Sequence, residues 1–434
     1  MADALQDETA EVLSRLVRFR TVNPPGAERE CQEWLAAYLR DAGLEVELMG
    51  AEPERPNLVA RLEGGAPGPV LGYLSHVDTV LADPEDWTHD PWCGEVHDGF
   101  LWGRGAIDMK SQTAAEVVAA ATLARAGWRP ARGELKVIAV VDEEVGGHLG
   151  AKWLTEQHPD AARVDWLVNE VGGQMMPYDG RRLYGVGHAE KGTYRFRVRA
   201  TGVAGHASVP GTGDNALLKL VPVLERMGAR QPAYDVTDGA RATIAALGED
   251  PDDPAGAVER VRAVEPRLAT LLDPTLRVTA VPTRIFGSEK INVVPARAEL
   301  QVDCRVPPGI DSDHAMRRIR EVVGADGLEI TFMEEVAGTA SPRESPLMDA
   351  IAGWLGEHDP GAELLPFVLP AFTDSRWWRV AFPDCVAYGF FPQRHQSLYE
   401  TWELMHAADE RIDVRDLGFA AGFFAALPRT LLGP

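Results

Sequence analysis

Short apolar runs that end beside a histidine or a carboxylate recur through the first part of the chain. They are residues 70–74, followed by His76 and Asp78; residues 137–141, followed by Glu143 and Glu144; and residues 166–168, followed by Glu170. Apolar runs of this length are typical of buried strands. In an open α/β sheet the carboxyl ends of the strands meet in one crevice, so we expect these polar side chains to lie close together.

Helical and strand-like patterns alternate up to about residue 188. Helices are predicted at residues 8–18 and 28–42, and strands at residues 45–48, 57–62 and 70–74. This alternation predicts an α/β fold with a mainly parallel sheet that is covered by helices on both sides.

A differently patterned region follows. Residues 190–336 show the order βαββαβ, which predicts a four-stranded sheet with helices on one face, and residues 231–273 within it predict an acidic, proline-rich surface insertion. A chain of 434 residues is too long for one compact core. We therefore predict a catalytic domain made of residues 1–189 and 337–434, into which the smaller domain is inserted.

His76 and Asp78 are two residues apart, so on a strand their side chains leave the same face. A histidine that binds a metal needs its second ring nitrogen held, and a nearby carboxylate commonly does this. We assign His76 as a metal ligand and Asp78 as the residue that orients it. An ordinary polar pair at the surface is the alternative.

Asp108 follows Gly103 and Gly105 and precedes a long helical pattern. Glycines at such a turn let the chain approach a ligand closely, and a carboxylate there could hold one oxygen on each of two metal ions. The alternative is that Asp108 only caps the helix.

Glu143 and Glu144 are adjacent acids at a strand end. Neighbouring buried carboxylates repel each other unless cations or protons compensate, so the pair is either exposed to solvent or close to a metal. Beside zinc, which lowers the pKa of bound water to about 7, one glutamate can coordinate while the other removes the proton from that water. The second glutamate can later donate this proton to the departing amine.

Glu170 precedes two glycines, and His406 lies in a polar stretch before the last helical pattern. Taken alone, each of these two residues would be interpreted as an ordinary solvated side chain. Together with the other strand-end residues they form a set of two histidines and several carboxylates, which suits a pair of zinc ions. Cobalt or manganese can take the same ligands.

Nine motifs follow one another along nearly the whole chain: SHVDTV, GRGAIDMK, DEEVGG, NEVGG, EKGTYRFRV, GHAS, INVVPA, TDSR and HAADERI. In this order they resemble the zinc-dependent peptidase and aminoacylase family that includes acetylornithine deacetylase, succinyl-diaminopimelate desuccinylase, carboxypeptidase S and aminoacylase. The resemblance implies two Zn²⁺ per chain, bound by two overlapping sets of ligands: His76, Asp108 and Glu170 for one ion, and Asp108, Glu144 and His406 for the other. It also implies that Glu143 is the general acid and base and that Asp78 orients His76.

The same resemblance implies that the inserted domain acts as a lid and forms a homodimer. His206 resembles the lid-domain histidine that stabilises the tetrahedral oxyanion, often from the partner subunit. Asn292 and Arg305 resemble the pair that contacts the carboxylate side of the substrate, for which the planar fork of arginine is well suited. A turn asparagine and a surface arginine are the alternative interpretations.

The segment around Thr373 departs from the family pattern. Many relatives have paired glycines before the dipeptide TD, where this chain has PAFTDSRWWR. Phe372, Trp377 and Trp378 could line a substrate pocket or belong to the core, and residues 390–406 are bulky as well. The preferred acyl group or amino acid of this chain therefore cannot be inferred from that of any single relative.

Composition excludes several other classes of protein. A net charge of −23 disfavours binding to nucleic acid or anionic lipid. No apolar run approaches the roughly 20 residues that span a bilayer, and the acidic N-terminus lacks the charge pattern of a signal peptide, so we expect a cytoplasmic protein. The four cysteines have no metal-binding or disulfide spacing and are expected to be reduced.

The leading hypothesis is a dinuclear zinc hydrolase that cleaves the amide bond of a small N-acyl amino acid or dipeptide. Metal-bound hydroxide would attack the carbonyl, with Glu143 as general base. The alternative is a catalytically silent relative that binds or regulates, although every expected catalytic position is filled. A nucleotide-dependent enzyme is a weaker reading because the chain lacks both a strand-to-helix GxGxxG and a P-loop.

Overall fold

The computed structural model describes residues 2–324 and 327–433, which form two compact units. The first unit contains the described residues of Met1–His188, Ser341–Pro366 and Thr373–Pro434. The second contains those of Ala189–Ala340 and Phe367–Phe372. The second unit is therefore inserted in the sequence of the first, and the chain crosses between them four times.

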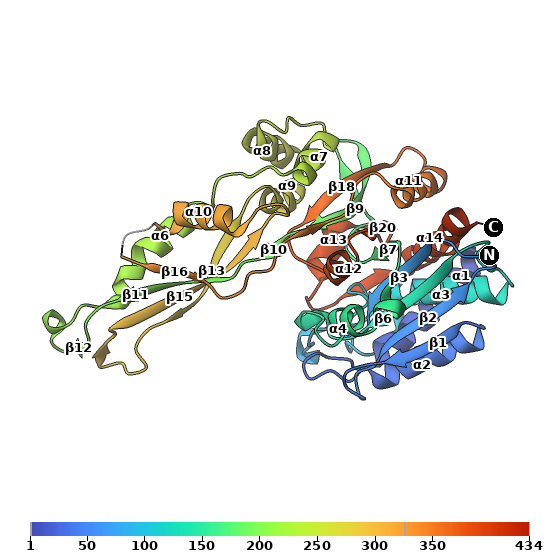
Figure 1. Cartoon of the computed structure of the whole chain (residues 1–434), viewed down its shortest axis with the longest axis horizontal. Coiled ribbons are helices and arrows are strands. Elements are labelled where there is room, and N and C mark those ends of the chain that lie inside the picture. Colours follow the sequence, from blue (N-terminus) through green and yellow to red (C-terminus); the bar gives the residue numbers. More distant parts are fainter. Residues whose placement is uncertain (1, 325–326, 434) are drawn as a thin grey trace. The chain divides into compact units, whose positions relative to one another are not determined.

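A long mixed sheet forms the centre of the first unit (Figure 1). Its strands follow the order β1 (Glu45–Met49), β2 (Asn57–Glu63), β6 (Glu134–Val140), β3 (Val70–His76), β7 (Trp166–Asn169), β19 (Val386–Gly389), β9 (Arg181–Glu190), β8 (Gln174–Tyr178) and β20 (Gln393–Ser397). The middle strands β6, β3, β7 and β19 are parallel to one another, whereas the pairs β1–β2, β2–β6 and β8–β9 are antiparallel. The predicted parallel arrangement thus holds where the candidate ligands lie.

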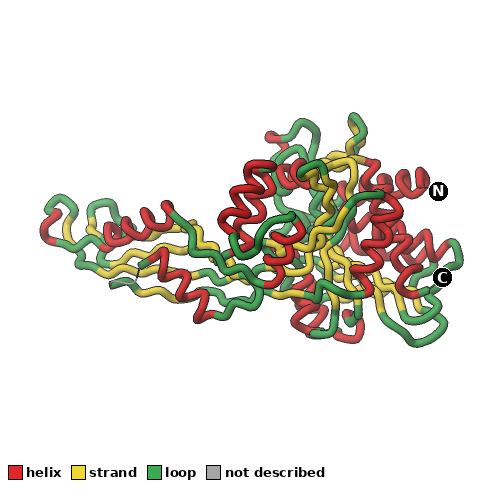
Figure 2. Tube along the Cα trace, turned by 90° about the horizontal axis from the view of Figure 1, so that it is seen from above, coloured by secondary structure: helices red, strands yellow, loops and turns green. Residues whose placement is uncertain are grey.

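Alternate residues of these strands face two separate cores. On β6, Leu135 and Val137 belong to one core, and Ile138 and Val140 belong to the other. The first core is covered by α1 (Ala2–Arg18), α2 (Arg29–Asp41), α3 (Lys110–Arg125), α11 (Pro346–His358) and α14 (Val414–Leu432), and the second by α4 (Ala151–Gln157), α5 (Pro159–Ala162) and α12 (Ser375–Ala381). Helices cover both faces, as predicted (Figure 2), and burial on both faces explains why the central strands are apolar throughout.

The elements predicted near the N-terminus are confirmed. The helices are α1 and α2, and the strands are β1, β2 and β3, with ends that differ from the predicted ones by at most two residues except at the start of α1. That helix begins six residues earlier than predicted: its first turns include the exposed Asp3 and Asp7, but Leu5 already packs against the first core.

The second unit is built on a five-stranded antiparallel sheet of β10 (Gly192–Thr193), β11 (Phe196–Thr201), β13 (Thr279–Phe286), β15 (Arg297–Val306) and β16 (Glu329–Phe332). Along β15 every second residue, from Ala298 to Val306, is buried. This face packs against α6 (Val221–Ala229) and α10 (Ser312–Val323). The elements run β11, α6, β13, β15, α10, β16, which is the order expected from the sequence.

The acidic segment 231–273 folds into three helices, α7 (Asp238–Ala246), α8 (Pro254–Val264) and α9 (Pro266–Leu272). Lys191 anchors the end of this insertion, because its buried Nζ donates hydrogen bonds to the carbonyls of Pro274 (2.7 Å) and Arg277 (2.8 Å). Burial lowers the pKa of Lys191 to about 7. Lys191 of the EKG motif thus has structural partners in the backbone.

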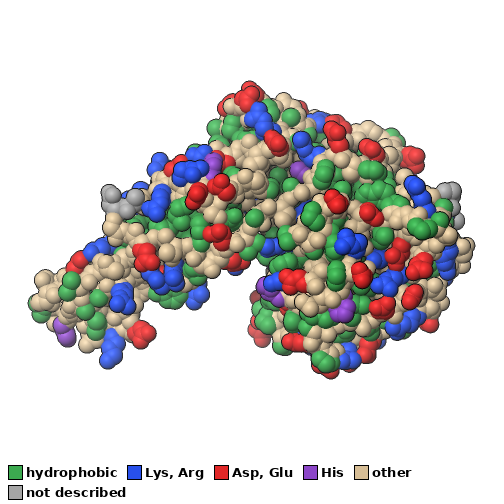
Figure 3. All heavy atoms as spheres, viewed as in Figure 1, with side chains coloured by type: hydrophobic (Ala, Val, Ile, Leu, Met, Phe, Trp, Pro, Cys, Tyr) green, Lys and Arg blue, Asp and Glu red, His purple; other side chains and the backbone are tan. Residues whose placement is uncertain are grey.

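Acidic and basic side chains are interspersed over the face shown in Figure 3. None of the helices in the described residues is long and apolar enough to cross a bilayer. The four cysteines are free thiols, of which Cys31, Cys304 and Cys385 are buried.

Glu116 on α3 is a carboxyl group inside the first core. It accepts a hydrogen bond from Gln112 Nε2 (2.8 Å), and burial raises its pKa to about 8 from an ordinary value of 4.5. The folded state therefore retains a proton that the unfolded state loses between about pH 4.5 and 8. Across this window the carboxyl group lowers the free energy of unfolding as the pH rises.

We predict that Glu116→Gln leaves the free energy of unfolding little changed at pH 5 and raises it by on the order of 3 kcal/mol at pH 8, because the amide has no proton to lose. Urea unfolding of parent and variant at both pH values measures this difference. The exposed Glu11→Gln on α1 is the control and is expected to change stability little at either pH. An equal effect of Glu116→Gln at pH 5 and pH 8 would contradict the prediction.

Candidate metal centre

Four of the candidate residues of the first unit, His76, Glu143, Glu144 and Glu170, lie at or just after the ends of adjacent parallel strands. His76 is the last residue of β3 and pairs with Val140 near the end of β6. Glu143 starts the 3-10 turn after β6, and Glu170 directly follows β7. Because β3 is parallel to both β6 and β7, the three side chains reach one edge of the sheet.

The carboxylate of Asp108 lies between two histidines. Its Oδ1 is 3.2 Å from His76 Nε2, and its Oδ2 is 3.0 Å from His406 Nε2. His76 Nε2 is also 3.9 Å from Glu170 Oε2, and His406 Nε2 is 3.3 Å from Glu144 Oε2. Each oxygen of Asp108 therefore faces a different histidine, and each histidine has a glutamate beside it.

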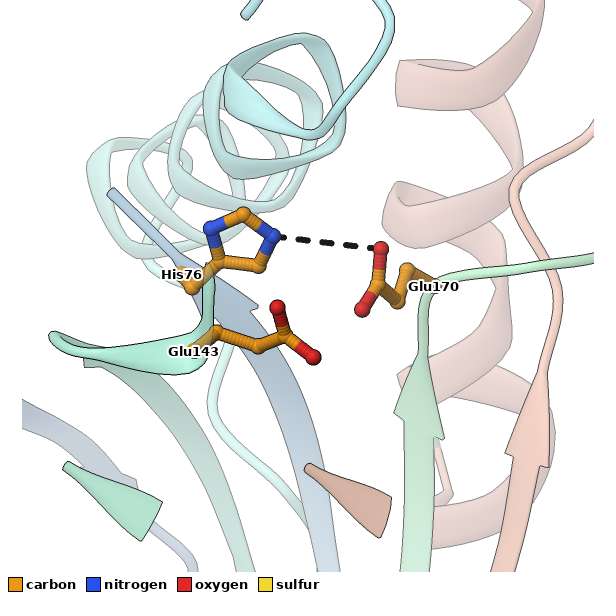
Figure 4. A group of neighbouring side chains, drawn as sticks. All are labelled: His76, Glu143 and Glu170. Carbon is orange, nitrogen blue, oxygen red and sulfur yellow. Dashed lines mark ion pairs between the residues drawn. The ribbon is translucent and has the colours of Figure 1, made fainter. Parts of the chain in front are cut away.

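Glu143 points into the space beside His76 and Glu170 (Figure 4). One potential ligand atom from each of these three residues lies within 4.8 Å of the others. The same limit holds for His76, Asp108 and Glu144. The structure therefore brings together all the residues of the catalytic domain that the sequence singled out as ligands or as the base.

Asp78 holds both His76 and the turn that carries the two glutamates. His76 Nδ1 is 3.0 Å from the Asp78 carbonyl oxygen and 3.5 Å from its Oδ1, so the carbonyl is the nearer partner. The carboxylate accepts hydrogen bonds from the N–H groups of Glu143 (3.2 Å) and Glu144 (3.1 Å) and from Asn23 Nδ2 (2.8 Å). Burial alone would raise the pKa of Asp78, but the hydrogen bonds from His76 and these donors bring it below its ordinary value.

Three non-glycine residues at or beside the candidate ligands have left-handed backbone conformations. They are Asp142 (φ 73°), Val171 (φ 64°) and His406 (φ 60°). Such conformations cost roughly 1 to 3 kcal/mol each and are found preferentially at functional sites. Asp142 is fixed there by hydrogen bonds from Arg55 Nη1 (3.0 Å) and the Leu149 N–H (3.0 Å) to its carboxylate.

The centre has more acidic groups than basic ones. Among the described residues, the ion pairs of its carboxylates are formed with His76 and His406 alone. Burial, together with the neighbouring carboxylates, raises the pKa of Glu143 and Glu170 well above the ordinary value. Hydrogen bonds to Asp108 and Glu144 raise the pKa of His406 to about 10.

This donor set fits divalent metal ions. Imidazole nitrogens and carboxylate oxygens at these separations are the ligands that zinc and related ions take in proteins. Cations would also offset the negative charge that burial makes unfavourable.

Glu410 belongs to the centre although the sequence did not single it out. Its buried carboxylate accepts hydrogen bonds from Arg104 Nη1 (2.6 Å) and from the N–H groups of Gly105 (3.0 Å), Ile107 (2.6 Å) and Asp108 (3.0 Å). Arg104 also donates to the carbonyl of Ala407 (3.0 Å). Glu410 and Arg104 thus join the loop of Asp108 to the loop of His406, and no spacing in the sequence indicates this.

A small sheet strengthens this junction. It contains β4 (Val96–His97), β5 (Phe100–Trp102) and β21 (Arg411–Asp413), with Arg411 paired to Trp102. The C-terminal segment is therefore held against the segment that leads to Asp108.

The three residues predicted in the inserted domain lie in the second unit. His206 is an exposed residue of β12 (Gly205–His206), which pairs with β14 (Val293–Val294), and its neighbour Ala207 donates a backbone hydrogen bond to Asn292 (3.0 Å). Arg305 is near the opposite end of β15, with its Nε 2.8 Å from Asp303 Oδ1. At about 3.3 Å per residue the length of β15 separates Arg305 from the other two by roughly 25 Å. One copy of this unit does not bring Asn292 and Arg305 together.

Two aromatic residues of the segment around Thr373, which differs from the family pattern, have different environments. Trp378 is fully buried in the second core and donates a hydrogen bond to the Ala162 carbonyl (2.8 Å), so it is a core residue. Phe372 belongs to the second unit, where Arg305 lies 5.8 Å from its ring centroid.

Comparison with known proteins agrees with this geometry. The model of peptidase family M20/M25/M40 matches residues 72–430. The chain belongs to this peptidase family. The predicted relationship to zinc-dependent peptidases and aminoacylases is thereby confirmed, and the protein is a hydrolase of the M20 metallopeptidase and aminoacylase group.

Relatives of this M20 enzyme cover nearly its whole length. It is 28% identical over 407 residues to aminoacylase-1 of Sus scrofa, covering 91% of this chain and 88% of that protein. It is also 28% identical over 421 residues to the succinyl-diaminopimelate desuccinylase of Paracoccus denitrificans, covering 93% of each. An M20 metallo-carboxypeptidase from Sulfolobus solfataricus has the same fold, with a TM-score of 0.74 at 16% identity over 98% of this chain and 99% of that one.

We predict that Glu410→Gln weakens zinc binding 10- to 100-fold, because an amide cannot accept all four hydrogen bonds that position the Asp108 loop. Competition with a chromophoric chelator measures the affinity, and thermal unfolding is expected to show a lower melting temperature. Glu403→Gln, exposed on the segment before His406, is the control. Unchanged zinc affinity in Glu410→Gln would refute the positioning role.

Proposed function

We propose that the protein is a dinuclear zinc hydrolase that cleaves the amide bond of a small N-acyl amino acid or dipeptide. The observation that carries this proposal is Asp108, whose two oxygens face separate histidines at 3.2 and 3.0 Å. A carboxylate so placed is suited to bridge two ions. His76 and Glu170 would complete the ligands of one ion, and Glu144 and His406 those of the other.

The ligand set fits zinc, with cobalt or manganese as possible substitutes. When bound, the ions would polarise the scissile carbonyl and lower the pKa of water toward 7. The remaining roles belong to side chains of the protein.

Glu143 is the proposed general base and acid. Its carboxylate lies within 4.8 Å of the ligand atoms of His76 and Glu170, and Asp78 fixes its backbone through the Glu143 N–H (3.2 Å). It would remove a proton from the attacking water and donate that proton to the departing nitrogen. Asp78 would meanwhile keep the ring of His76 oriented.

The substrate class rests on the relatives and on the inserted domain. Aminoacylase and desuccinylase are the named activities of the two relatives above, and Arg305 with Asn292 would bind a free carboxylate of the substrate. His206 would stabilise the oxyanion. Because Arg305 is distant from His206 and Asn292 within one chain, a homodimer in which the partner supplies the latter two is part of the proposal, as is a cytoplasmic location.

A catalytically silent protein is the competing function. It would bind metal or ligand without turnover. The closeness of Glu143 to the candidate ligands favours the enzyme, since a binding protein has no use for an additional, half-buried carboxyl group there.

We predict that Glu143→Gln retains two metal ions per chain while kcat falls roughly 100- to 10,000-fold, because only the proton transfer is lost. Elemental analysis and steady-state assays on N-acetyl, N-succinyl and N-long-acyl amino acids and dipeptides measure both quantities. Glu144→Gln is the contrasting variant and is expected to lower the metal content. Substantial turnover by metal-loaded Glu143→Gln would mean that the base is another residue.

We also predict that mixed dimers of His206→Ala and Glu143→Ala chains recover activity, because one of the two centres then receives an intact Glu143 and an intact partner His206. Each variant alone is expected to be inactive. Refolding the two chains together and assaying hydrolysis tests this, and no recovery in verified mixed dimers would count against action in trans.

A further inference from the structure

A partly enclosed pocket lies beside the candidate metal centre, entirely within the first unit. Asp108 and Glu170 form part of its wall. The rest is mainly apolar and includes Met109, Val171, Phe391, Leu398, Trp402 and Met405.

Three residues of the pocket wall are direct chain neighbours of candidate ligands. Met109 follows Asp108, Val171 follows Glu170, and Met405 precedes His406. Any group that fills the pocket therefore lies next to the atoms that would surround the metals. Such a position corresponds to a substituent of the substrate close to the reacting carbonyl.

One wall of the pocket is the short helix α13 (Leu398–Leu404). Leu398 and Trp402 are four residues apart and so share a helix face, while Tyr399 and Thr401 are buried elsewhere in the core. A capping box fixes the start of the helix: the Ser397 side chain accepts a hydrogen bond from the Glu400 N–H, and Glu400 Oε2 accepts one from the Ser397 N–H (2.8 Å). The Ser397 Oγ also donates to Glu400 Oε2 (2.6 Å). Trp402 nevertheless remains 38% exposed. A large aromatic side chain that is held in place but incompletely covered is typical of a ligand-binding surface.

The charge of the residues that line the pocket restricts which substrate groups can bind in it. Its only ionisable residues are Asp108 and Glu170, both acidic, and its remaining polar residues are Gln112 and Gln174. A substrate carboxylate in this pocket would find no Lys, Arg or His side chain among the lining residues. The proposed metal ions would be its only cationic neighbours there, and they would already be held by Asp108 and Glu170 and engaged with the scissile carbonyl. An apolar group, in contrast, gains about three- to fourfold in binding for each methylene that is buried.

We propose that this pocket binds an uncharged, apolar substituent next to the scissile carbonyl, and that it selects against a second carboxylate there. The proposal rests on the proposed function and specifies its substrate class: N-acyl amino acids with an alkyl or aryl acyl group, or dipeptides with an apolar side chain at that position. Trp402 and Leu398 are the specificity-determining residues. The enzyme would therefore differ from a desuccinylase in its acyl preference.

The sharpest test compares N-butanoyl and N-succinyl derivatives of one amino acid, because the acyl groups have equal length and differ in a terminal methyl or carboxylate. We expect kcat/KM of the parent to be at least 100-fold higher for the butanoyl compound and to rise at least tenfold from N-acetyl to N-hexanoyl. A matching series of dipeptides with glycine, alanine or leucine before the scissile bond shows whether the side chain uses the pocket instead.

Trp402→Ala and Leu398→Ala are expected to reduce the preference for hexanoyl over acetyl, or for leucine over glycine, by about tenfold, with two metal ions retained. Glu403→Ala, on the same helix but exposed and outside the lining, is the control and should keep the parental ratios. Preference for the succinyl compound, or ratios that neither pocket variant changes, would overturn the proposal while leaving the hydrolase function intact.

A binding measurement separates this inference from the proposed function. If none of the amides is hydrolysed, the hydrolase proposal fails, and calorimetric titration of the zinc-loaded protein with hexanoate and succinate still tests the pocket. Tighter binding of hexanoate that Trp402→Ala weakens supports the pocket assignment. Equal binding of the two acids, or no binding, overturns it.

Discussion

Buried negative charge at the carboxyl edge of one sheet is the constraint on which the site depends. Asp108, Glu143, Glu144 and Glu170 approach two imidazoles in a largely buried space, and burial raises the pKa of the three glutamates. Such a cluster is unfavourable without compensating cations or protons. Bound divalent ions would compensate this negative charge. The same carboxylates that are unfavourable without metal would then serve as its ligands.

The surrounding hydrogen bonds hold this charge in a defined geometry. On one side, the buried Arg55 joins Glu28 (2.6 Å) to Asp142 (3.0 Å), and Asp142 precedes the two glutamates. On the other side, Glu410 and Arg104 join the loops of Asp108 and His406. Removing one partner of either pair would leave a buried charge uncompensated, which is strongly destabilising. Positioning residues therefore matter to this centre as much as the ligands do.

On these proposals, selectivity would be carried by different residues from those that carry the reaction. Of the proposed ligands and base, His76, Glu143, Glu144 and Glu170 lie at or just after the ends of central strands, and Asp108 and His406 lie on loops. The apolar pocket, in contrast, is completed by α13, a helix outside the central sheet. Members of one family can therefore share a metal centre and differ in the acyl group that they accept. In this chain, the pocket lining contains no basic residue, and on the proposal above this would favour an alkyl or aryl substituent over a carboxylated one.

The sequence by itself determined the α/β class, the inserted unit with its βαββαβ order and the candidates for ligands and base, because apolar periodicity reports burial and acids at the ends of apolar runs are conspicuous. It did not show that the inserted sheet is antiparallel and has a fifth strand, β10. It could not identify Glu410, Arg104 or Asn23, whose partners are between 55 and 306 residues away. Nor could it show that each oxygen of Asp108 faces a different histidine. Those facts depend on strand register and on the pairing of β21 with β5, and contacts between distant segments leave no periodic trace in a single sequence. Only the tertiary structure showed that these separate acids and histidines lie close together, with one histidine on each side of Asp108. It also showed an apolar pocket beside them.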